Sequence, residues 1–437
     1  MPACRLFLPA IRVFCVLCCF SAFPAQAQRF LSDYDSTLFL RDTMVEVVSR
    51  FEHLHISAYI QPQFQVASAK GANSYEGGNF TEHSNNRFML RRARFKFDYQ
   101  LPKKGKPLPL GVMTFQMDIN ERRVTVRDIF VRLYEPKGQN FSFTLGMFAR
   151  PFGYEVNLSS QYRESPERAR ASQVLMPSER DLGAMITYDP VKRRRGRPAL
   201  KWDLGMFNGQ GIAATSDFDS YKDLISRVTL KPYAFNKSLS LSGGLSLLYG
   251  GWRQDTRYRW EPVRGTGKFA PDSTESNEGT KAPRHYYGAD LQLQYKHGWG
   301  KTEIRGEYWW GVQPGTAEST ENPNTQPQGP TYVRPFAAGI FYFLQNIGSP
   351  RWELGLKYDW YDANRYVSGM QIGAPGGNLT AADIRYSNWS GGLTWYWNEH
   401  VKVLAWYAHV VNERSQLNGY TNDRPDDVFT LRTQFRF

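Results

Sequence analysis

The chain ends in the stretch DDVFTLRTQFRF, residues 426–437, in which apolar and polar residues alternate. A period of two is typical of a β-strand that has one apolar face and one polar face. Such a strand needs a hydrogen-bonding partner along each edge, and its apolar face needs a cover. The stretch therefore raises two questions: which strands pair with it, and what its apolar face contacts.

The same alternation recurs along most of the chain. In MLRRARFKFDYQ (89–100), Phe95 and Phe97 have one parity while Arg94 and Lys96 have the other. Sixteen segments read as strands with one apolar face. They are 54–66, 86–100, 109–119, 124–135, 141–149, 182–189, 199–208, 222–234, 238–250, 284–297, 300–311, 333–345, 350–361, 387–397, 399–411 and 428–437.

The connections between these segments alternate in length. Brief turns such as HGWG, NE and NIGS follow the even-numbered segments. Long insertions follow most odd-numbered segments: 67–85, 150–181, 251–283, 312–332 and 362–386. Short turns at one rim, long loops at the other and an even strand number are typical of a bacterial outer-membrane barrel. In lipid an open sheet edge is too costly, so the last strand is expected to pair with the first.

Composition agrees with this all-β, transmembrane, antiparallel barrel. The chain has 25 Tyr, 28 Phe and 12 Trp, yet its mean hydropathy is −0.53. Strands that alternate lipid-facing and water-facing residues give such a mixture. The formal net charge of +13 favours anionic solutes.

The N-terminal part differs from the rest. Residues 1–27 predict a secretory signal. Arg5 and Arg12 precede an apolar run, and the small residues of Ala25-Gln26-Ala27 follow it. All four cysteines lie within it, which excludes disulfides and cysteine metal sites from the remainder. Residues 28–50 lack the alternation and predict a short periplasmic helical segment, so that residues 51–437 form the barrel.

Several motifs resemble the phosphate-selective porin O and P family. They occur in the family's order over most of the chain: AYIQPQFQV, FMLRRARFKFDY, VRDIFVRLY, FTLGMFARPFGYE, ERDLGAMI, LGMFNGQG and GADLQLQYKHG with IRGEYWWG. The resemblance implies a trimeric channel of 16 strands that passes anions, in some members phosphate. The segment 28–50 is not part of this pattern.

The polar strand faces predict a water-filled lumen with a basic bias. The inward cations and the anion path are predicted to comprise Arg92, Arg94, Lys96, Arg132, Arg150, Arg305, Lys357, Arg432 and Arg436. Carboxylates share the inward face: Asp98, Asp118, Asp128, Asp290, Glu303, Glu307 and Asp359. Rings of Arg and Lys are what anion pores use, because a guanidinium offers paired donors to phosphate or carboxylate oxygens.

The insertion 150–181 occupies the position at which the resembling porins fold a loop inward. Arg163, Arg168 and Arg170 are therefore candidates for a constriction, although a solvated surface loop would fit the same composition. Arg91 has the parity of the outward Phe95. A β-bulge, a position above the lipid or a buried trimer contact would each explain it.

Other classes of function find little support. The seven histidines have no spacing that predicts a metal site, and no motif indicates a catalytic nucleophile or a phosphate-binding loop. The basic run at 191–198 is expected to be a solvated turn and not a nucleic-acid site. We therefore predict a passive, anion-preferring porin without cofactor. The alternatives are a general channel for sugars or peptides, favoured by inward aromatic residues, and a structural barrel with a plugged pore.

Overall fold

The computed structural model describes residues 53–177, 179–191, 198–214 and 216–437. The predicted signal (1–27) and the predicted helical segment (28–50) lie outside the described residues.

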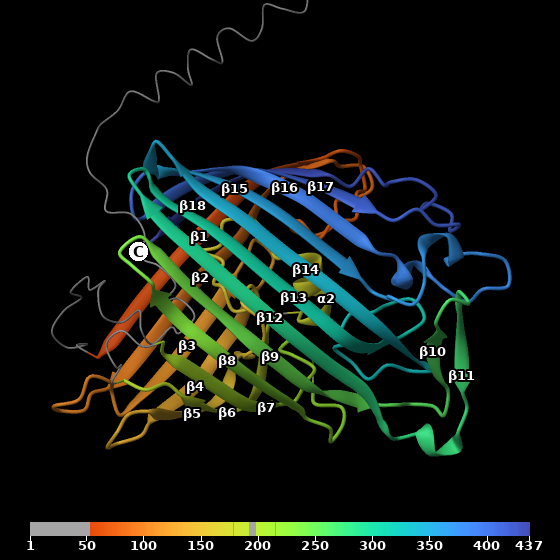
Figure 1. Cartoon of the computed structure of the whole chain (residues 1–437), viewed down its shortest axis with the longest axis horizontal. Coiled ribbons are helices and arrows are strands. Elements are labelled where there is room, and N and C mark those ends of the chain that lie inside the picture. The colour runs from red at the N-terminus through yellow and green to blue at the C-terminus, as the bar shows by residue number, and fades with distance from the viewer. Residues whose placement is uncertain (1–52, 178, 192–197, 215) are drawn as a thin grey trace, which may run out of the picture.

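Sixteen strands form one closed antiparallel barrel (Figure 1). β1 pairs with both β2 and β18, which closes the cylinder, and β9 pairs with β12. The strands are β1 (Leu54–Ala67), β2 (Asn86–Leu101), β3 (Gly111–Ile119), β4 (Val124–Tyr134), β5 (Phe141–Ala149), β6 (Arg180–Tyr188), β7 (Leu200–Phe207), β8 (Asp223–Ala234), β9 (Leu239–Arg253), β12 (Lys281–His297), β13 (Gly300–Gly315), β14 (Thr331–Ile347), β15 (Ser349–Asp362), β16 (Tyr386–Tyr396), β17 (Val401–Asn412) and β18 (Val428–Arg436). The prediction of a 16-stranded antiparallel barrel is confirmed.

The last strand answers the opening questions. Phe429, Leu431 and Phe435 point outward, with 39, 43 and 49% of their surface exposed. Thr430 and Gln434 point inward and are buried. The outward face therefore meets the surroundings of the barrel, and the inward face meets whatever fills the lumen.

The long-loop end carries a few elements outside the barrel wall. β10 (Arg259–Val263) and β11 (Lys268–Asp272) form a hairpin, and β10 also makes a short parallel contact with β14. The sequence did not predict these strands, because each has five residues and contains a proline, which weakens a strand pattern. The same end holds three 3₁₀ turns, η3 (Glu275–Asn277), η4 (Gly369–Gln371) and η5 (Ala381–Asp383).

Register shifts occur between β1 and β2, β3 and β4, β8 and β9, and β14 and β15, and the first two are bulges whose extra residue is an arginine. Gln61 pairs with Arg92 and Pro62 with Leu90, so Arg91 is the extra residue of β2. Pro62 has no N–H to donate, and a bulge opposite it removes the need for that hydrogen bond. In β4, Gln116 pairs with Asp128 and Met117 with Val126, so the extra residue is Arg127. Each bulge turns one additional arginine into the lumen.

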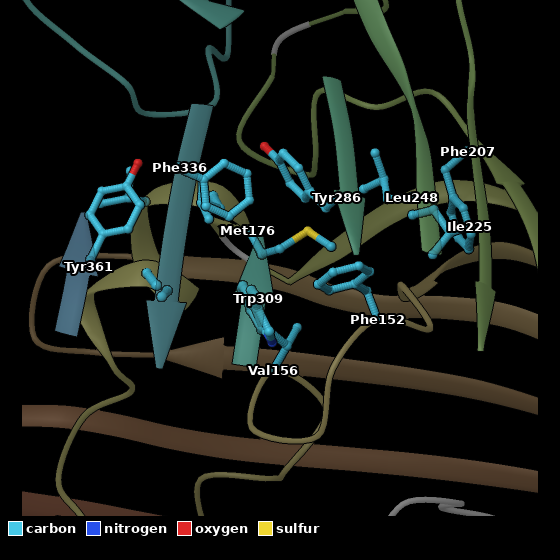
Figure 2. Packing of buried hydrophobic residues seen from close by; sticks show 14 of the residues in the cluster. Phe152, Val156, Met176, Phe207, Ile225, Leu248, Tyr286, Trp309, Phe336 and Tyr361 are labelled. Atoms are coloured by element: carbon cyan, nitrogen blue, oxygen red, sulfur yellow. The ribbon is translucent and has the colours of Figure 1, made fainter. Parts of the chain in front are cut away.

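The lumen contains a buried cluster of apolar side chains (Figure 2). It joins wall residues such as Phe207, Ile225 and Leu248 to residues of the segment between β5 and β6, among them Phe152 and Met176. That segment contains the one α-helix of the described residues, α2 (Arg170–Leu175). No helix in the described part of the chain is long and apolar enough to span a membrane.

Candidate functional site

The connection between β5 and β6, residues 150–179, folds into the barrel, and we call it the inner loop. Its residue Ser178 is not described. The loop starts at β5 and contacts strands that lie far from β5 around the barrel. Its Ser165 hydroxyl lies 2.9 Å from the hydroxyl of Tyr342 in β14, and Lys402 of β17 donates to the Gln161 carbonyl at 2.9 Å. The inner loop therefore crosses the lumen. Of the two possibilities that the sequence left open, an inward fold and a solvated surface loop, the structure has the inward fold.

Apolar packing anchors the start of the inner loop. Phe152 is fully buried and meets Tyr286 and Trp309 edge to face, with ring centroids 6.0 and 5.0 Å apart (Figure 2). Edge-to-face contacts of this kind add to the stabilisation from area burial. The following backbone is held by a wall carboxylate, because the N–H groups of Tyr154 and Glu155 donate to Glu307 at 2.8 and 2.9 Å.

Ion pairs hold the middle of the inner loop to two parts of the wall. Arg305 of β13 binds the Glu164 carboxylate through both terminal nitrogens, each at 2.8 Å, and also pairs with Glu303. Glu167 binds Arg91 and Arg92 of β2 and Arg432 of β18. The bulge explains the orientation of Arg91: of the three explanations that the sequence left open, the structure has the β-bulge.

A third set of pairs joins the end of the inner loop to β2 and β4. Arg127 and Arg168 both pair with Glu179, and Arg180 pairs with Asp128 at 3.0 Å. Asp118 in β3 accepts from Arg94 at 2.9 Å and lies 3.7 Å from Arg127. This network is almost fully buried, and buried charges of this kind are stable only when they are paired and hydrogen-bonded.

The predicted lumen cations lie inside the barrel, and most of them have partners. Arg92 binds Glu167, Arg94 binds Asp118, and Lys96 binds Asp98 at 2.8 Å. Lys357 lies 3.0 Å from Asp359 and 3.8 Å from Glu155 of the inner loop.

The remaining five predicted cations also have contacts within the barrel. Arg132 donates to the Thr144 hydroxyl at 3.0 Å. Arg150 is buried and donates to the Pro177 carbonyl at 3.3 Å. Arg436 donates to the Glu399 carbonyl at 2.7 Å and stands over the ring of Tyr162, while Arg305 and Arg432 bind the inner loop as described.

The three constriction candidates have different surroundings. Arg163 is buried and donates to the carbonyls of Ser165 and Pro166. Arg168 binds Glu179 and the carbonyls of Glu155 and Val156, so it braces the loop internally. Arg170 stacks over Tyr386 at 3.2 Å and over Tyr75 at 4.4 Å, and its guanidinium has no hydrogen-bond or ion-pair acceptor among the described residues.

Arg170 lines a small pocket between the inner loop, the connection 68–85 and the wall. The pocket has about 380 Å³ of empty space and includes Tyr75, Glu76, Asp359 and Asp426. Burial raises the pKa of Glu76 to about 7, with Lys357 opposing the shift. Burial also raises the pKa of Asp426 to about 6, with Arg170 opposing it. Both carboxyls belong to loops and not to the spanning strands.

Sequence reasoning missed several inward cations. Arg91 and Arg127 are bulge residues, and the strict alternation placed Arg91 on the outer face. Lys402 lies in VKVLAWYAHV, where both faces are apolar, so only the cost of a charge facing lipid could have indicated its inward direction. No group of three or more His, Cys, Asp or Glu among the described residues is arranged to hold a metal ion.

Comparison with known proteins relates the C-terminal part of the barrel to a family. The family model described as phosphate-selective porin O and P matches residues 331–437, which run from β14 to the C-terminus. Over these residues the chain is similar to that family. As a 16-stranded porin barrel it is a protein of the bacterial outer membrane. No curated protein sequence matches the chain.

Solved porins share the fold of this porin at low sequence identity. The outer-membrane channel DcaP of Acinetobacter baumannii has a TM-score of 0.53 at 9% identity, covering 88% of this chain and 97% of that one. OprB of Pseudomonas putida has a TM-score of 0.52 at 9% identity, over 88% and 94%. The anion-selective porin from Comamonas acidovorans has a TM-score of 0.51 at 11% identity, over 88% and 99%. At these identities the likeness concerns the fold.

Proposed function

We propose that this porin passes small anions, phosphate among them, by passive diffusion through its lumen and carries out no chemistry on them. The observation that carries the proposal is an uneven wall, which we call the basic wall, made by β17, β18 and β2 to β4. Its inward cations are Arg91, Arg92, Arg94, Lys96, Arg127, Arg132, Lys402, Arg432 and Arg436. Its inward carboxylates are Asp98, Asp118 and Asp128.

The surplus of cations on the basic wall favours anions along that side. A unit charge pair at 4 Å is worth roughly 1 kcal/mol in water and about 4 kcal/mol near a protein surface. An attraction in the lower part of this range biases permeation without trapping the ion, which conduction requires. The cations that already bind carboxylates contribute less than their number suggests, because each pair is close to neutral.

The alternative of a sugar or peptide channel depends on inward aromatic rings that a solute can stack on. Those rings are largely covered. Trp309 packs against Phe152, and the Tyr59 hydroxyl lies 2.6 Å from Ser160 of the inner loop. The covered rings favour the anion proposal over this alternative.

Reversal potentials in a salt gradient test the proposal. The wild-type porin, reconstituted in planar bilayers, is expected to prefer chloride over potassium by a factor of a few, and R436E is expected to lower that ratio about twofold or more. Arg436 suits this test because its guanidinium donates to the backbone carbonyl of Glu399, so that hydrogen bond leaves no carboxylate unpaired when it is lost. R257Q, which changes an exposed loop charge, is the control and is expected to keep the wild-type ratio. Cation preference in the wild type would refute the proposal.

We also infer that the porin assembles as a homotrimer, as its family resemblance implies. Small residues with outward parity, Ala58, Gly111 and Gly306, would let neighbouring barrels approach closely. Mass measurement in mild detergent is expected to give three chains per particle. A particle of one chain under the mildest conditions would contradict the trimer but not the barrel.

A further inference from the structure

One carboxylate of the inner loop has an unusual set of partners. Glu167 Oε1 lies 2.7 Å from Arg91 Nε and 2.9 Å from Arg432 Nη2, and Glu167 Oε2 lies 2.9 Å from Nη2 of both Arg91 and Arg92. Only 3% of the Glu167 side chain is exposed. We call Arg91, Arg92 and Arg432 the arginine cradle. It belongs to the wall, whereas its occupant belongs to the loop.

The arginine cradle holds more donors than its occupant can use. Arg163 also acts on Glu167, so four guanidinium groups surround one carboxylate. Arg92 Nη1 and Arg163 Nη1 are buried and have no acceptor among the described residues. Glu76, another carboxylate that interacts with Glu167, accepts a hydrogen bond from Asn388 instead. Buried donors without an acceptor are costly, and an anion that enters the site would satisfy them.

The charge state of Glu167 agrees with this geometry. Burial alone would raise its pKa, but Arg91, Arg92, Arg432 and Arg163 together hold the pKa of Glu167 well below its usual range. Glu167 is therefore an ionised carboxylate bound by paired guanidinium donors, which is the arrangement in which arginine recognises carboxylate ligands.

We propose that the arginine cradle is a binding site for the carboxylate group of a permeating solute, and that Glu167 is a tethered competitor that occupies it in the empty porin. A soluble carboxylate that displaces Glu167 removes one of the ties between the inner loop and the wall. The remaining ties, such as Arg305 with Glu164, keep the loop in the lumen. The proposal rests on the anion-passing function proposed above and names a solute class for it.

Two matched variants of the inner loop test the competition. E167Q removes the tethered charge and leaves the cradle in place. E164Q removes a loop-to-wall ion pair of similar geometry, but Arg305 keeps Glu303 as its partner, so no cradle is freed. The readout is block of the chloride current by succinate, with inorganic phosphate as the second probe at a pH where both are dianions.

E167Q is expected to lower the half-blocking succinate concentration about tenfold, which corresponds to about 1.4 kcal/mol. E164Q is expected to stay within about twofold of the wild type, because distant sites act independently. Equal changes of the half-blocking succinate concentration in E167Q and E164Q would show that Glu167 only fixes the loop. That result would overturn the proposal. If E167Q lowers the half-blocking concentration of phosphate as much as that of succinate, the assignment to carboxylates is overturned.

A second measurement does not depend on conductance or on folding of E167Q. The four cysteines of the chain lie at positions 4 to 19, so Q161C adds a single thiol to the inner loop near its tie to Lys402. Succinate is expected to speed the reaction of this thiol with a water-soluble reagent several-fold, and succinamide, which is uncharged and of similar size, is expected to leave it unchanged. An unchanged rate with succinate would overturn the competition. A porin that carries no anion current but shows the succinate effect would refute the proposed function and not the site.

Discussion

Replacing Arg305 with methionine is expected to destabilise the folded porin by about 3–5 kcal/mol. Arg305 neutralises Glu164 of the inner loop and Glu303 of its own strand, and all three side chains are less than a tenth exposed. Methionine fills a similar length but leaves the buried Glu164 without the cation that binds it, and leaves Glu303 with Lys301 as its remaining partner. Urea unfolding in lipid vesicles, followed by tryptophan fluorescence, measures the loss.

A surface pair supplies the control for this variant. Arg257 and Glu275 lie 3.4 Å apart in the loop region, with 44 and 90% of their side chains exposed. Exposed pairs contribute about 0–1 kcal/mol, so R257Q is expected to change the free energy of unfolding very little. If R305M unfolds at the same urea concentration as R257Q, the buried network does not stabilise the barrel as inferred here.

Raising the pH through the range from about 4.5 to about 7 is expected to loosen the connection 68–85 from the inner loop. Burial raises the pKa of Glu76 from 4.5 to about 7 in the folded porin. Between these values the folded state binds the proton more tightly than the unfolded chain, so stability is highest below the unfolded pKa and falls as the pH rises. The full effect is about 3 kcal/mol, because one pKa unit corresponds to 1.36 kcal/mol.

Amide hydrogen exchange of residues 72–80 measures this loosening. Wild-type protection, corrected for the intrinsic rate, is expected to fall from pH 5 to pH 8, whereas protection in E76Q is expected to fall clearly less because glutamine does not ionise. Asp426, whose pKa burial raises to about 6, lines the same pocket and adds to the fall in both proteins. Only the difference between wild type and E76Q reports on Glu76. Identical pH profiles would contradict the assignment to this carboxyl.

The barrel itself was predictable because its rule is local. Every strand alternates with a period of two, and each apolar face meets lipid while each polar face turns inward. The segment 428–437 shows this, since Phe429 and Leu431 are exposed while Thr430 and Arg432 are buried. Arg92, Arg94 and Lys96 share the polar parity of their segment, and each of them pairs with a carboxylate in the structure. Closure followed from the cost of open backbone groups in lipid, which applies to any such chain.

The partners of those lumen residues were not predictable from the sequence. Glu164 meets Arg305 across 141 positions, and Glu167 meets Arg432 across 265. The inner loop has equal numbers of basic and acidic side chains, and its composition fits a surface loop as well as a plug. Only the fold brings the inner loop against the wall. There the charged groups are removed from water, so a charge without a partner is costly.

The sequence by itself determined the number of strands, their inward faces and the basic bias of the lumen, because alternation is imposed residue by residue by lipid on one side and water on the other. The tertiary structure decided which cations remain available to an anion. A bulge opposite Pro62 turns Arg91 inward beside Arg92, and the inner loop places Glu167 between them and Arg432. Those outcomes depend on register and on contacts between distant strands, which no local period encodes.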